Sequence, residues 1–132
     1  KHQRFSGRIR TVKCFRDNGL VKQLANSEGK GAVMVVDGGG SLASALMGDQ
    51  IAEAACKNNW AGVIIFGAIR DSVAINRMEF GLKALGTNPR KSAKDGAGEI
   101  DVTVSFGNVD FVPHAYLYSD EDGILVSAEP LA

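Results

Sequence analysis

The stretch "AVMVVD" at residues 32–37 decides the fold that we expect, because no polar side chain interrupts it before the final aspartate. Such runs are typical of strands that are buried on both faces of a parallel sheet. A second apolar run, "AGVIIFG", follows at 61–67, and "DQIAEAACKN" at 49–58 has apolar residues at helical spacing. Strand, helix and strand in this order predict a right-handed βαβ unit.

The amino-terminal part of the chain predicts one more strand and one more helix. Residues 5–14, "FSGRIRTVKC", mix β-branched and polar residues in near alternation, which is typical of a strand with one wet face. Residues 17–31, "DNGLVKQLANSEGKG", have Leu20, Val21 and Leu24 at helical spacing and glycines at the end. We therefore expect a helix over this stretch.

The carboxyl-terminal half predicts mostly strands. We expect a short helix around 72–79, a strand at 81–86 and a charged loop through about residue 99. From 101 to 127 apolar and polar residues alternate between glycines and a proline, as in antiparallel strands. The predicted fold class is α/β, with a βαβ half and an antiparallel β-rich half in a single domain over residues 1–132.

The charge balance limits the classes of partner. Fifteen basic residues balance fifteen acidic ones, so no strong overall field attracts nucleic acid or an anionic membrane. The most basic stretch, "NPRKSAK" at 88–94, contains no aromatic residue. We therefore expect neither direct nucleic-acid binding nor membrane association.

Cysteine usage and hydropathy indicate the compartment. Cys14 and Cys56 lie far apart in the sequence, and we expect both to be reduced. The apolar runs are far shorter than the ~20 residues that span a bilayer, and no signal-like segment opens the chain, which predicts a cytoplasmic protein. Because the chain opens on Lys1 rather than methionine, we expect that a preceding segment is missing.

The segment "VVDGGGS" at 35–41 has more than one interpretation. A strand followed by an acid and glycines is how many nucleotide sites begin, and the D-x-G-x-G opening of methyltransferases is similar. However, Ala43 stands where a dinucleotide site needs its third glycine, and Ser41 replaces the last glycine of the methyltransferase pattern. A tight turn that needs positive φ or a close backbone approach is the structural alternative.

Two short segments carry the candidate chemistry. Gly48 and Asp49 lie at the expected start of a helix, where free N–H groups favour an anion, although Asp49 could simply be a helix cap. Arg70 and Asp71 follow the second buried strand, at the carboxyl edge where ligands of open α/β sheets bind. Arg70 can hold a carboxylate through two hydrogen bonds and Asp71 can bind a divalent ion, but a plain surface ion pair has the same residues.

The combination of these segments resembles a known family. Asp49 is followed by 20 residues and then by Arg70 and Asp71, with "VVDGGGSL" upstream and "ALGTNPRKS" and "DEDGILVS" downstream. This pattern is similar to that of the RraA-like family, which comprises the regulator of ribonuclease activity A and 4-hydroxy-4-methyl-2-oxoglutarate aldolases. The resemblance extends from about Phe5 to Leu131.

The resemblance implies roles for individual residues. In the aldolases, the arginine at the position of Arg70 contacts the pyruvate moiety, and the aspartate at the position of Asp71 holds Mg²⁺ or Mn²⁺. Asp49 would orient a water on the metal or relay protons, and backbone amides would take the substrate carboxylate. The positions that line the substrate site correspond here to Gly48, Asp49, Gln50 and Ile51.

The resemblance also implies an activity and an assembly. A class II aldolase of this kind would cleave a 4-hydroxy-2-oxo acid to pyruvate through an enolate, and oxaloacetate decarboxylation would share that enolate. A swivelling β/β/α fold and a homotrimer with active sites near the subunit junctions are implied as well. Relatives without the arginine–aspartate pair are thought to act by binding ribonuclease E, so a non-enzymatic inhibitor of ribonuclease E or a helicase is the alternative.

The remaining polar and aromatic features of the tail have structural explanations. His114, within "VPHAYLY", could be a general base, but a lone loop histidine is typical of the surface. "SDEDG" at 119–123 could hold a metal, but it is also typical of a turn between two strands. The aromatic residues that suit a core as well as a subunit interface are Phe106, Phe111, Tyr116 and Tyr118.

Overall fold

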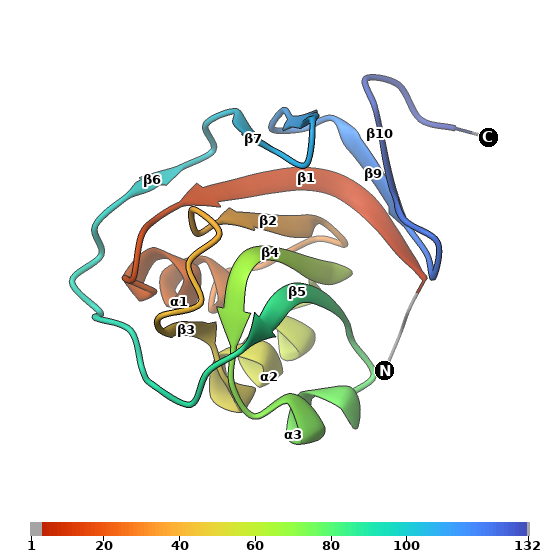
Figure 1. Cartoon of the computed structure of the whole chain (residues 1–132). Helices are drawn as coiled ribbons and strands as arrows, with labels where there is room; N and C mark the ends of the chain where they lie inside the picture. Colours follow the sequence, from red (N-terminus) through yellow and green to blue (C-terminus); the bar gives the residue numbers. More distant parts are fainter. Residues whose placement is uncertain (1–3, 132) are drawn as a thin grey trace.

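The protein has three layers in the computed structural model, which describes residues 4–131, so that Lys1 lies outside the described residues. Helices cover one face of a curved central sheet, and antiparallel hairpins cover the other face (Figure 1). The helices are α1 (Gly19–Ala25), α2 (Asp49–Lys57) and α3 (Ser72–Asn76). This arrangement is the β/β/α order of layers that the family resemblance implied.

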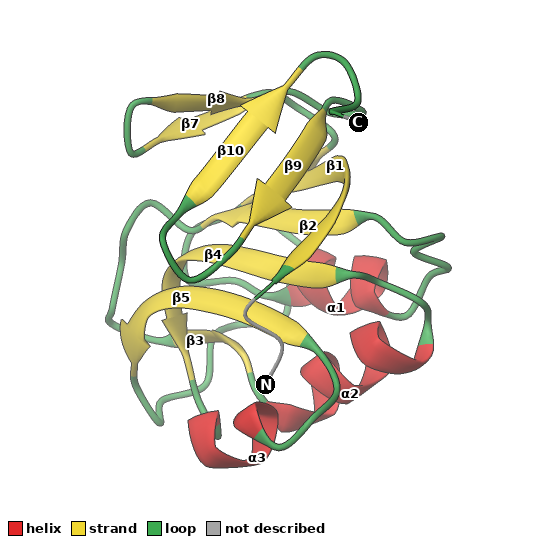
Figure 2. Ribbon diagram, turned by 90° about the vertical axis from the view of Figure 1, so that its right-hand side faces the viewer, coloured by secondary structure: helices red, strands yellow, loops and turns green. Residues whose placement is uncertain are grey.

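The central sheet contains eight strands within the described residues. They are β1 (Phe5–Lys13), β2 (Val33–Asp37), β3 (Ala45–Met47), β4 (Gly62–Ile69), β5 (Gly81–Thr87), β6 (Glu99–Ile100), β9 (Tyr116–Ser119) and β10 (Ile124–Ser127). A separate antiparallel pair is formed by β7 (Val104–Phe106) and β8 (Val109–Phe111). Strand β1 pairs with β9 through its first residues and with β2 through its last, and Figure 2 shows β9–β10 and β7–β8 on the side of the parallel strands away from the helices.

The middle of the sheet is parallel, as the apolar runs predicted. Strand β4 pairs in parallel with β2, with β3 and with β5, and β2 pairs in parallel with β1. The carboxyl ends of these strands consequently lie along the same side of the sheet, which is the edge formed by the strand ends. The predicted antiparallel tail is also confirmed, because β9 pairs antiparallel with both β1 and β10.

Two hydrophobic cores explain why the runs at 32–37 and 61–67 contain so few polar residues. Met34 and Val36 pack into the core between the sheet and the helices. Val33 and Val35 point the other way, into the core beneath the antiparallel layer. Alternate side chains of one strand are thus buried on opposite faces, so neither set can be polar.

Several element boundaries differ from the predictions. Helix α1 covers only Gly19–Ala25 of the predicted 17–31, because Asn26 ends it and Lys30 and Gly31 adopt positive φ values of 52° and 77°. Helix α3 likewise ends at Asn76 rather than near 79. Strands β3 and β6 were not predicted at all, since each is too short for its side chains to show a period.

The aromatic residues of the tail pack within the chain. Phe106 stacks between Phe66 and Phe111, with ring centroids 4.6 Å and 4.5 Å away. The hydroxyl of Tyr116 accepts a hydrogen bond from Arg8 at 2.7 Å, and the hydroxyl of Tyr118 accepts one from the amide of Leu131 at 2.7 Å. The core interpretation is confirmed for Phe106 and Phe111, whereas Tyr116 and Tyr118 are half-buried and lie outside both cores.

Both cysteines are free, as predicted. Burial raises the pKa of the Cys14 thiol to about 12, and the nearby carboxylates of Asp17 and Asp37 add to the rise. The thiol is consequently protonated at neutral pH and is not a nucleophile. None of the helices in residues 4–131 is long and apolar enough to cross a membrane.

Candidate functional site at the carboxyl edge of the sheet

The two segments that carry the candidate chemistry lie side by side. Strand β3 ends at Met47 and β4 ends at Ile69, and these two residues are paired in parallel. One residue further on, the amide of Arg70 donates a hydrogen bond to the carbonyl oxygen of Met47 at 2.9 Å. The prediction that Asp49 and Arg70 share one edge of the sheet is therefore confirmed.

Asp71 joins the two segments through its side chain. Its Oδ2 accepts hydrogen bonds from Nη1 of Arg70 at 2.9 Å and from the backbone amide of Asp49 at 3.2 Å. The backbone of Asp71 is left-handed, with φ 58° and ψ 37°, a conformation that aspartate tolerates better than most residues but that still costs energy. The surrounding hydrogen bonds hold this residue in a strained geometry.

Gly48 makes room for the guanidinium of Arg70. A Cβ atom at position 48 would lie 2.7 Å from Cζ of Arg70 and 2.9 Å from its Nε and Nη2. Any side chain there would push the guanidinium away, so the glycine permits a close approach of the arginine to the backbone before α2. Arg70 is consequently positioned on two sides, by the Gly48 backbone and by the Asp71 carboxylate.

An open cleft of about 380 Å³ contains the arginine–aspartate pair. Its lining residues are Arg70, Asp71, Ser72, Val73, Thr87, Asn88 and Pro89. Thr87 and Asn88 were not predicted to belong to the site. They could have been predicted from their position, because they directly follow the predicted strand at 81–86, just as Arg70 directly follows β4.

None of the four positions at the start of α2 is among the residues that line this cleft; Gly48 and Asp49 only contact its residues Arg70 and Asp71. Gly48 is the N-cap residue and Asp49 the first helical residue, so the alternative that Asp49 caps the helix is wrong. The side chain of Ile51 is buried in the core next to the helices. Gln50 lines a separate hollow with Glu53 and Lys57. Only the backbone amides of Gln50 and Ile51, which lack intrahelical acceptors in a first turn, can contribute to an anion site.

The Asp49 carboxylate is half-buried and makes no hydrogen bond or ion pair within residues 4–131. Its backbone amide, in contrast, is held by Asp71. The residue therefore brings an uncommitted carboxylate to the chain segment that contacts Asp71.

The donors at this site fit a divalent ion that is bound mainly by water and substrate. Oδ2 of Asp71 is engaged by Arg70 and Asp49, whereas Oδ1 accepts no hydrogen bond from the described residues. No group of three or more His, Cys, Asp or Glu side chains that could hold a metal occurs in the described chain. Mg²⁺ is commonly held by only one or two carboxylates, with waters and substrate oxygens completing its shell.

The glycine segment after β2 forms a turn. The amides of Gly38 and Gly40 both donate to the carbonyl oxygen of Phe66, and the amide of Gly39 donates to Oδ1 of Asp37. Gly39 and Gly40 have φ values of 69° and 73°, which confirms the need for positive φ. Because these amides already have acceptors, the segment offers no phosphate cradle.

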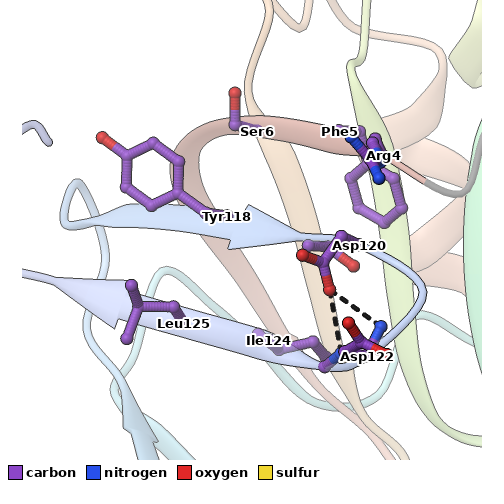
Figure 3. A pocket seen from close by; sticks show the side chains of 10 residues that line it. Arg4, Phe5, Ser6, Tyr118, Asp120, Asp122, Ile124 and Leu125 are labelled. Carbon is purple, nitrogen blue, oxygen red and sulfur yellow. Dashed lines mark hydrogen bonds between the residues drawn. The ribbon is translucent and has the colours of Figure 1, made fainter. Parts of the chain in front are cut away.

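A larger hollow, of about 580 Å³, lies at the opposite end of the parallel strands. It is bordered by the start of β1 and by the β9–β10 hairpin, where Asp120 and Asp122 point into it (Figure 3). Oδ1 of Asp120 accepts hydrogen bonds from the amides of Asp122 and Gly123, so the acidic segment is a turn, as predicted. Ligands of parallel sheets bind at the carboxyl end, and we therefore place the candidate site in the smaller cleft.

His114 lies in the β8–β9 connection, away from the cleft. Its amide donates to the carbonyl oxygen of Ile9, and its φ is 71°. The side chain does not line the cleft that contains Arg70. Its place in the turn, rather than catalysis, accounts for this residue.

The RraA-like family, described as Aldolase/RraA, matches residues 1–126, so this chain belongs to that family. A relative from Aromatoleum aromaticum is 54% identical over 127 residues, which are 96% of this chain and 80% of the relative. A relative from Dechloromonas aromatica is also 54% identical, over 96% of this chain and 78% of its own length. Both are named "Putative 4-hydroxy-4-methyl-2-oxoglutarate aldolase".

Solved structures confirm the fold class. The RNA-processing inhibitor RraA from Thermus thermophilis superposes with a TM-score of 0.97 at 45% identity, over 99% of this chain and 80% of that chain. A protein from Geobacillus kaustophilus, described as an S-adenosylmethionine: 2-dimethylmenaquinone methyltransferase, has a TM-score of 0.96 at 48% identity, over 98% and 81%. Proteins that are 45–54% identical to this chain are thus described by three different activities.

Proposed function

We propose that this protein is a divalent-metal-dependent aldolase that cleaves 4-hydroxy-2-oxo acids of the 4-hydroxy-4-methyl-2-oxoglutarate type to pyruvate. The observation that carries the proposal is the meeting of Arg70, Asp71 and the Gly48–Asp49 backbone at one edge of the sheet. The names of the relatives at 54% identity support the same reaction class.

The bond changes define what the site must do. The 4-hydroxyl group loses its proton, the C3–C4 bond breaks, and a carbonyl forms at C4. The electron pair of the broken bond passes to the C2 keto oxygen, which gives the enolate of pyruvate, and C3 then takes up a proton. Negative charge therefore grows at one oxygen, and a fixed cation beside that oxygen lowers the barrier.

Arg70 is the chain's own cation for this charge. Its guanidinium can hold the carboxylate and the keto oxygen of the pyruvyl part through parallel N–H donors. Because Gly48 and Asp71 already fix its position, little reorganisation is needed when the charge develops. A Mg²⁺ or Mn²⁺ ion held by Asp71 would add a second positive charge at the same oxygen.

Two further roles belong to the start of α2. The free amides of Gln50 and Ile51 would bind the substrate carboxylate, as helix amino termini bind anions. The uncommitted carboxylate of Asp49 would accept the proton of the 4-hydroxyl group or relay it to water. In this proposal the side chains of Gln50 and Ile51 have no catalytic part.

Decarboxylation of oxaloacetate is part of the same proposal. Loss of carbon dioxide from the carbon next to the keto group leaves the same enolate of pyruvate, so the same cationic groups stabilise it. Both reactions should then share one metal requirement. Both should also depend on Arg70 to the same degree.

A homotrimer with active sites near the subunit junctions is the assembly that we propose. The cleft is open, and the exposed Val73 in its wall leaves an apolar surface for a neighbouring copy. A light-scattering mass three times that of one chain is the expected result. A mass equal to one chain would contradict this assembly.

Inhibition of a ribonuclease is the second candidate function. The relative from Thermus thermophilis, an RNA-processing inhibitor, is 45% identical to this chain where the two align, over 99% of this chain. Such an inhibitor would bind ribonuclease E or a helicase through its outer surface and would need no metal. The intact arginine–aspartate pair favours the enzyme.

A coupled assay for pyruvate separates the two functions. Purified protein is mixed with 4-hydroxy-4-methyl-2-oxoglutarate, with other 4-hydroxy-2-oxo acids and with oxaloacetate, with Mg²⁺ or Mn²⁺ and after treatment with a chelator. We expect pyruvate from at least one acid, loss of activity with the chelator and recovery when the ion is returned. Full activity after chelation would rule out the metal role of Asp71, and no pyruvate together with ribonuclease capture would favour the inhibitor.

A further inference from the structure

Asn88 is hydrogen-bonded to the end of β4, the strand that directly precedes Arg70. It directly follows β5 and lines the cleft next to Arg70 and Asp71. Its backbone amide donates a hydrogen bond at 2.9 Å to the carbonyl oxygen of Ile69, the last residue of β4. The peptide bond between Ile69 and Arg70 is therefore held by Asn88 on one side and, through the Arg70 amide, by Met47 on the other.

The side chain of Asn88 reaches two more segments. Its Nδ2 donates to the carbonyl oxygen of Leu42 at 2.7 Å, and its Oδ1 accepts from the amide of Arg90 at 2.9 Å. Leu42 belongs to the connection between β2 and β3. Because a donor faces a carbonyl and an acceptor faces an amide, the orientation of the side-chain amide is uniquely determined.

These contacts continue to the other half of the candidate site. The carbonyl oxygen of Arg90 accepts a hydrogen bond at 2.8 Å from the amide of Ala45, the first residue of β3. Strand β3 leads within three residues to Gly48. Asn88 thus connects the end of β4, which carries Arg70, with the strand that leads to Gly48, on which the guanidinium of Arg70 packs.

We propose that Asn88 is a positioning residue for Arg70, and this proposal rests on the proposed aldolase function. Its polar groups contact backbone atoms and set the distance between the end of β4 and the residues that precede α2. A misplacement of about 1 Å in a site of this kind can cost up to a hundredfold in rate. Asn88 therefore acts on the reaction through the guanidinium and not through the substrate.

The first test compares two asparagines with similar hydrogen bonds. Asn58 also ties two segments, because its Nδ2 donates to the carbonyl oxygens of Ala25 and Ala54, but it lies at the far end of α2. Asn88→Ala keeps the backbone hydrogen bond to Ile69 but loses the side-chain contacts to Leu42 and Arg90, so that β3 and Gly48 can shift against Arg70; we expect kcat for pyruvate release to fall about tenfold. Asn58→Ala should leave kcat within about twofold of the wild type, since it loses similar hydrogen bonds without a connection to Arg70.

The second test is independent of turnover. Oxalate has the planar shape and charge of the pyruvate enolate, and its affinity in the presence of Mg²⁺ can be measured by calorimetry. We expect Asn88→Ala to weaken oxalate binding about fivefold in the wild-type background and by less than about twofold in the Arg70→Ala background, because coupled residues are not additive. A purely structural role would give the same loss in both backgrounds.

The outcomes separate this inference from the function on which it rests. If the wild type releases pyruvate and Asn88→Ala matches it, or if the losses are additive with Arg70→Ala, Asn88 has no positioning role. If the wild type neither releases pyruvate nor binds oxalate, the proposed function itself fails and the inference with it. Should Asn88→Ala not fold, Asn88→Asp serves instead: it keeps the acceptor for Arg90, loses the donor to Leu42, and must show the same non-additive loss.

Discussion

Two arginine–carboxylate pairs lie at opposite ends of the parallel strands. At the amino end, Arg4 pairs with Glu121 at 2.8 Å beside the larger hollow, and 78% of the Arg4 side chain is exposed. At the carboxyl end, Arg70 pairs with Asp71 at 2.9 Å in the smaller cleft, and 24% of the Arg70 side chain is exposed. The chemical groups are alike, but their surroundings differ.

The difference lies in what holds each arginine. Arg70 packs on the backbone of Gly48, and its partner Asp71 is held in turn by the amide of Asp49. Arg4 meets Glu121 across the surface, where solvent weakens the pair. A preorganised cation that is shielded from solvent stabilises developing charge far better than an exposed one, so the smaller and better supported cleft is the candidate site.

Removing each arginine in turn is the strongest way to test this comparison. We expect Arg70→Ala to lower pyruvate-forming turnover by about a hundredfold or more, the range found when one preorganised charge stabiliser is lost. Arg4→Ala should change turnover by less than about twofold, because an exposed ion pair contributes little. Steady-state kinetics on the two purified variants measures both values, and equal losses would show that the two ends cannot be distinguished.

A methyl group at Gly48 tests the support of Arg70 more finely. The new Cβ would collide with the guanidinium, which is the flexible end of a side chain and can move away. We expect Gly48→Ala to lower turnover about tenfold with little change in the melting temperature, because the loss is one of position. The matched control is Gly123→Ala at the amino end, where a Cβ would meet no atom within 4 Å and turnover should not change. An active Gly48→Ala variant would show that the close approach is unimportant.

A third and smaller effect concerns Asp17, which follows β1 at the carboxyl end of the parallel strands and contributes to the free energy of unfolding. Burial raises the pKa of Asp17, but the amides of Gly19, Gly96 and neighbouring residues lower it by more, so that the pKa lies below its ordinary value. Asp17 therefore stabilises the fold above its unfolded pKa, about 3.9, and this contribution disappears as the pH falls through the lower folded value. Asp17→Asn should lose about 1 kcal/mol of unfolding free energy at pH 7.

Acid titration of that variant provides the check. The difference in unfolding free energy between the wild type and Asp17→Asn should begin to shrink below about pH 4, where the unfolded chain takes up the proton, and should shrink further as the pH falls through the lower folded pKa. Asp120→Asn is the control at the amino end, since its carboxylate also accepts amide hydrogen bonds, two rather than the three of Asp17, but lies in an exposed turn. A constant difference from pH 7 to pH 3 would mean that the Asp17 charge is not what stabilises the fold.

The parallel part of the sheet could be predicted from the sequence, because burial on both faces leaves unmistakable runs. Strand β3 could not, since Ala45–Met47 becomes a strand only by pairing with β4 and by hydrogen bonding to Arg90. Helix α1 was predicted too long because apolar spacing does not show where the backbone turns. Long-range pairing, which the local sequence does not encode, accounts for the missed strand β3.

Only part of the candidate site could be predicted, because the rest depends on packing and on contacts between distant residues. The order of strand and helix places Gly48, Asp49, Arg70 and Asp71 at one edge of the sheet, and that needs no knowledge of side-chain packing. The direction of Gln50 and Ile51 depends on how α2 rotates onto the core, which the motif alone does not define. Asn88 was overlooked because its hydrogen bonds connect residues 42, 69 and 90, which are distant in the sequence.

A crystal structure of the protein grown with Mg²⁺ and oxalate tests the central claim most directly. The account predicts oxalate in the cleft between Arg70 and the start of α2, with the ion at the Asp71 carboxylate. Oxalate bound instead beside Arg4 and Asp120 in the larger hollow, with the carboxyl-end cleft empty, would contradict it.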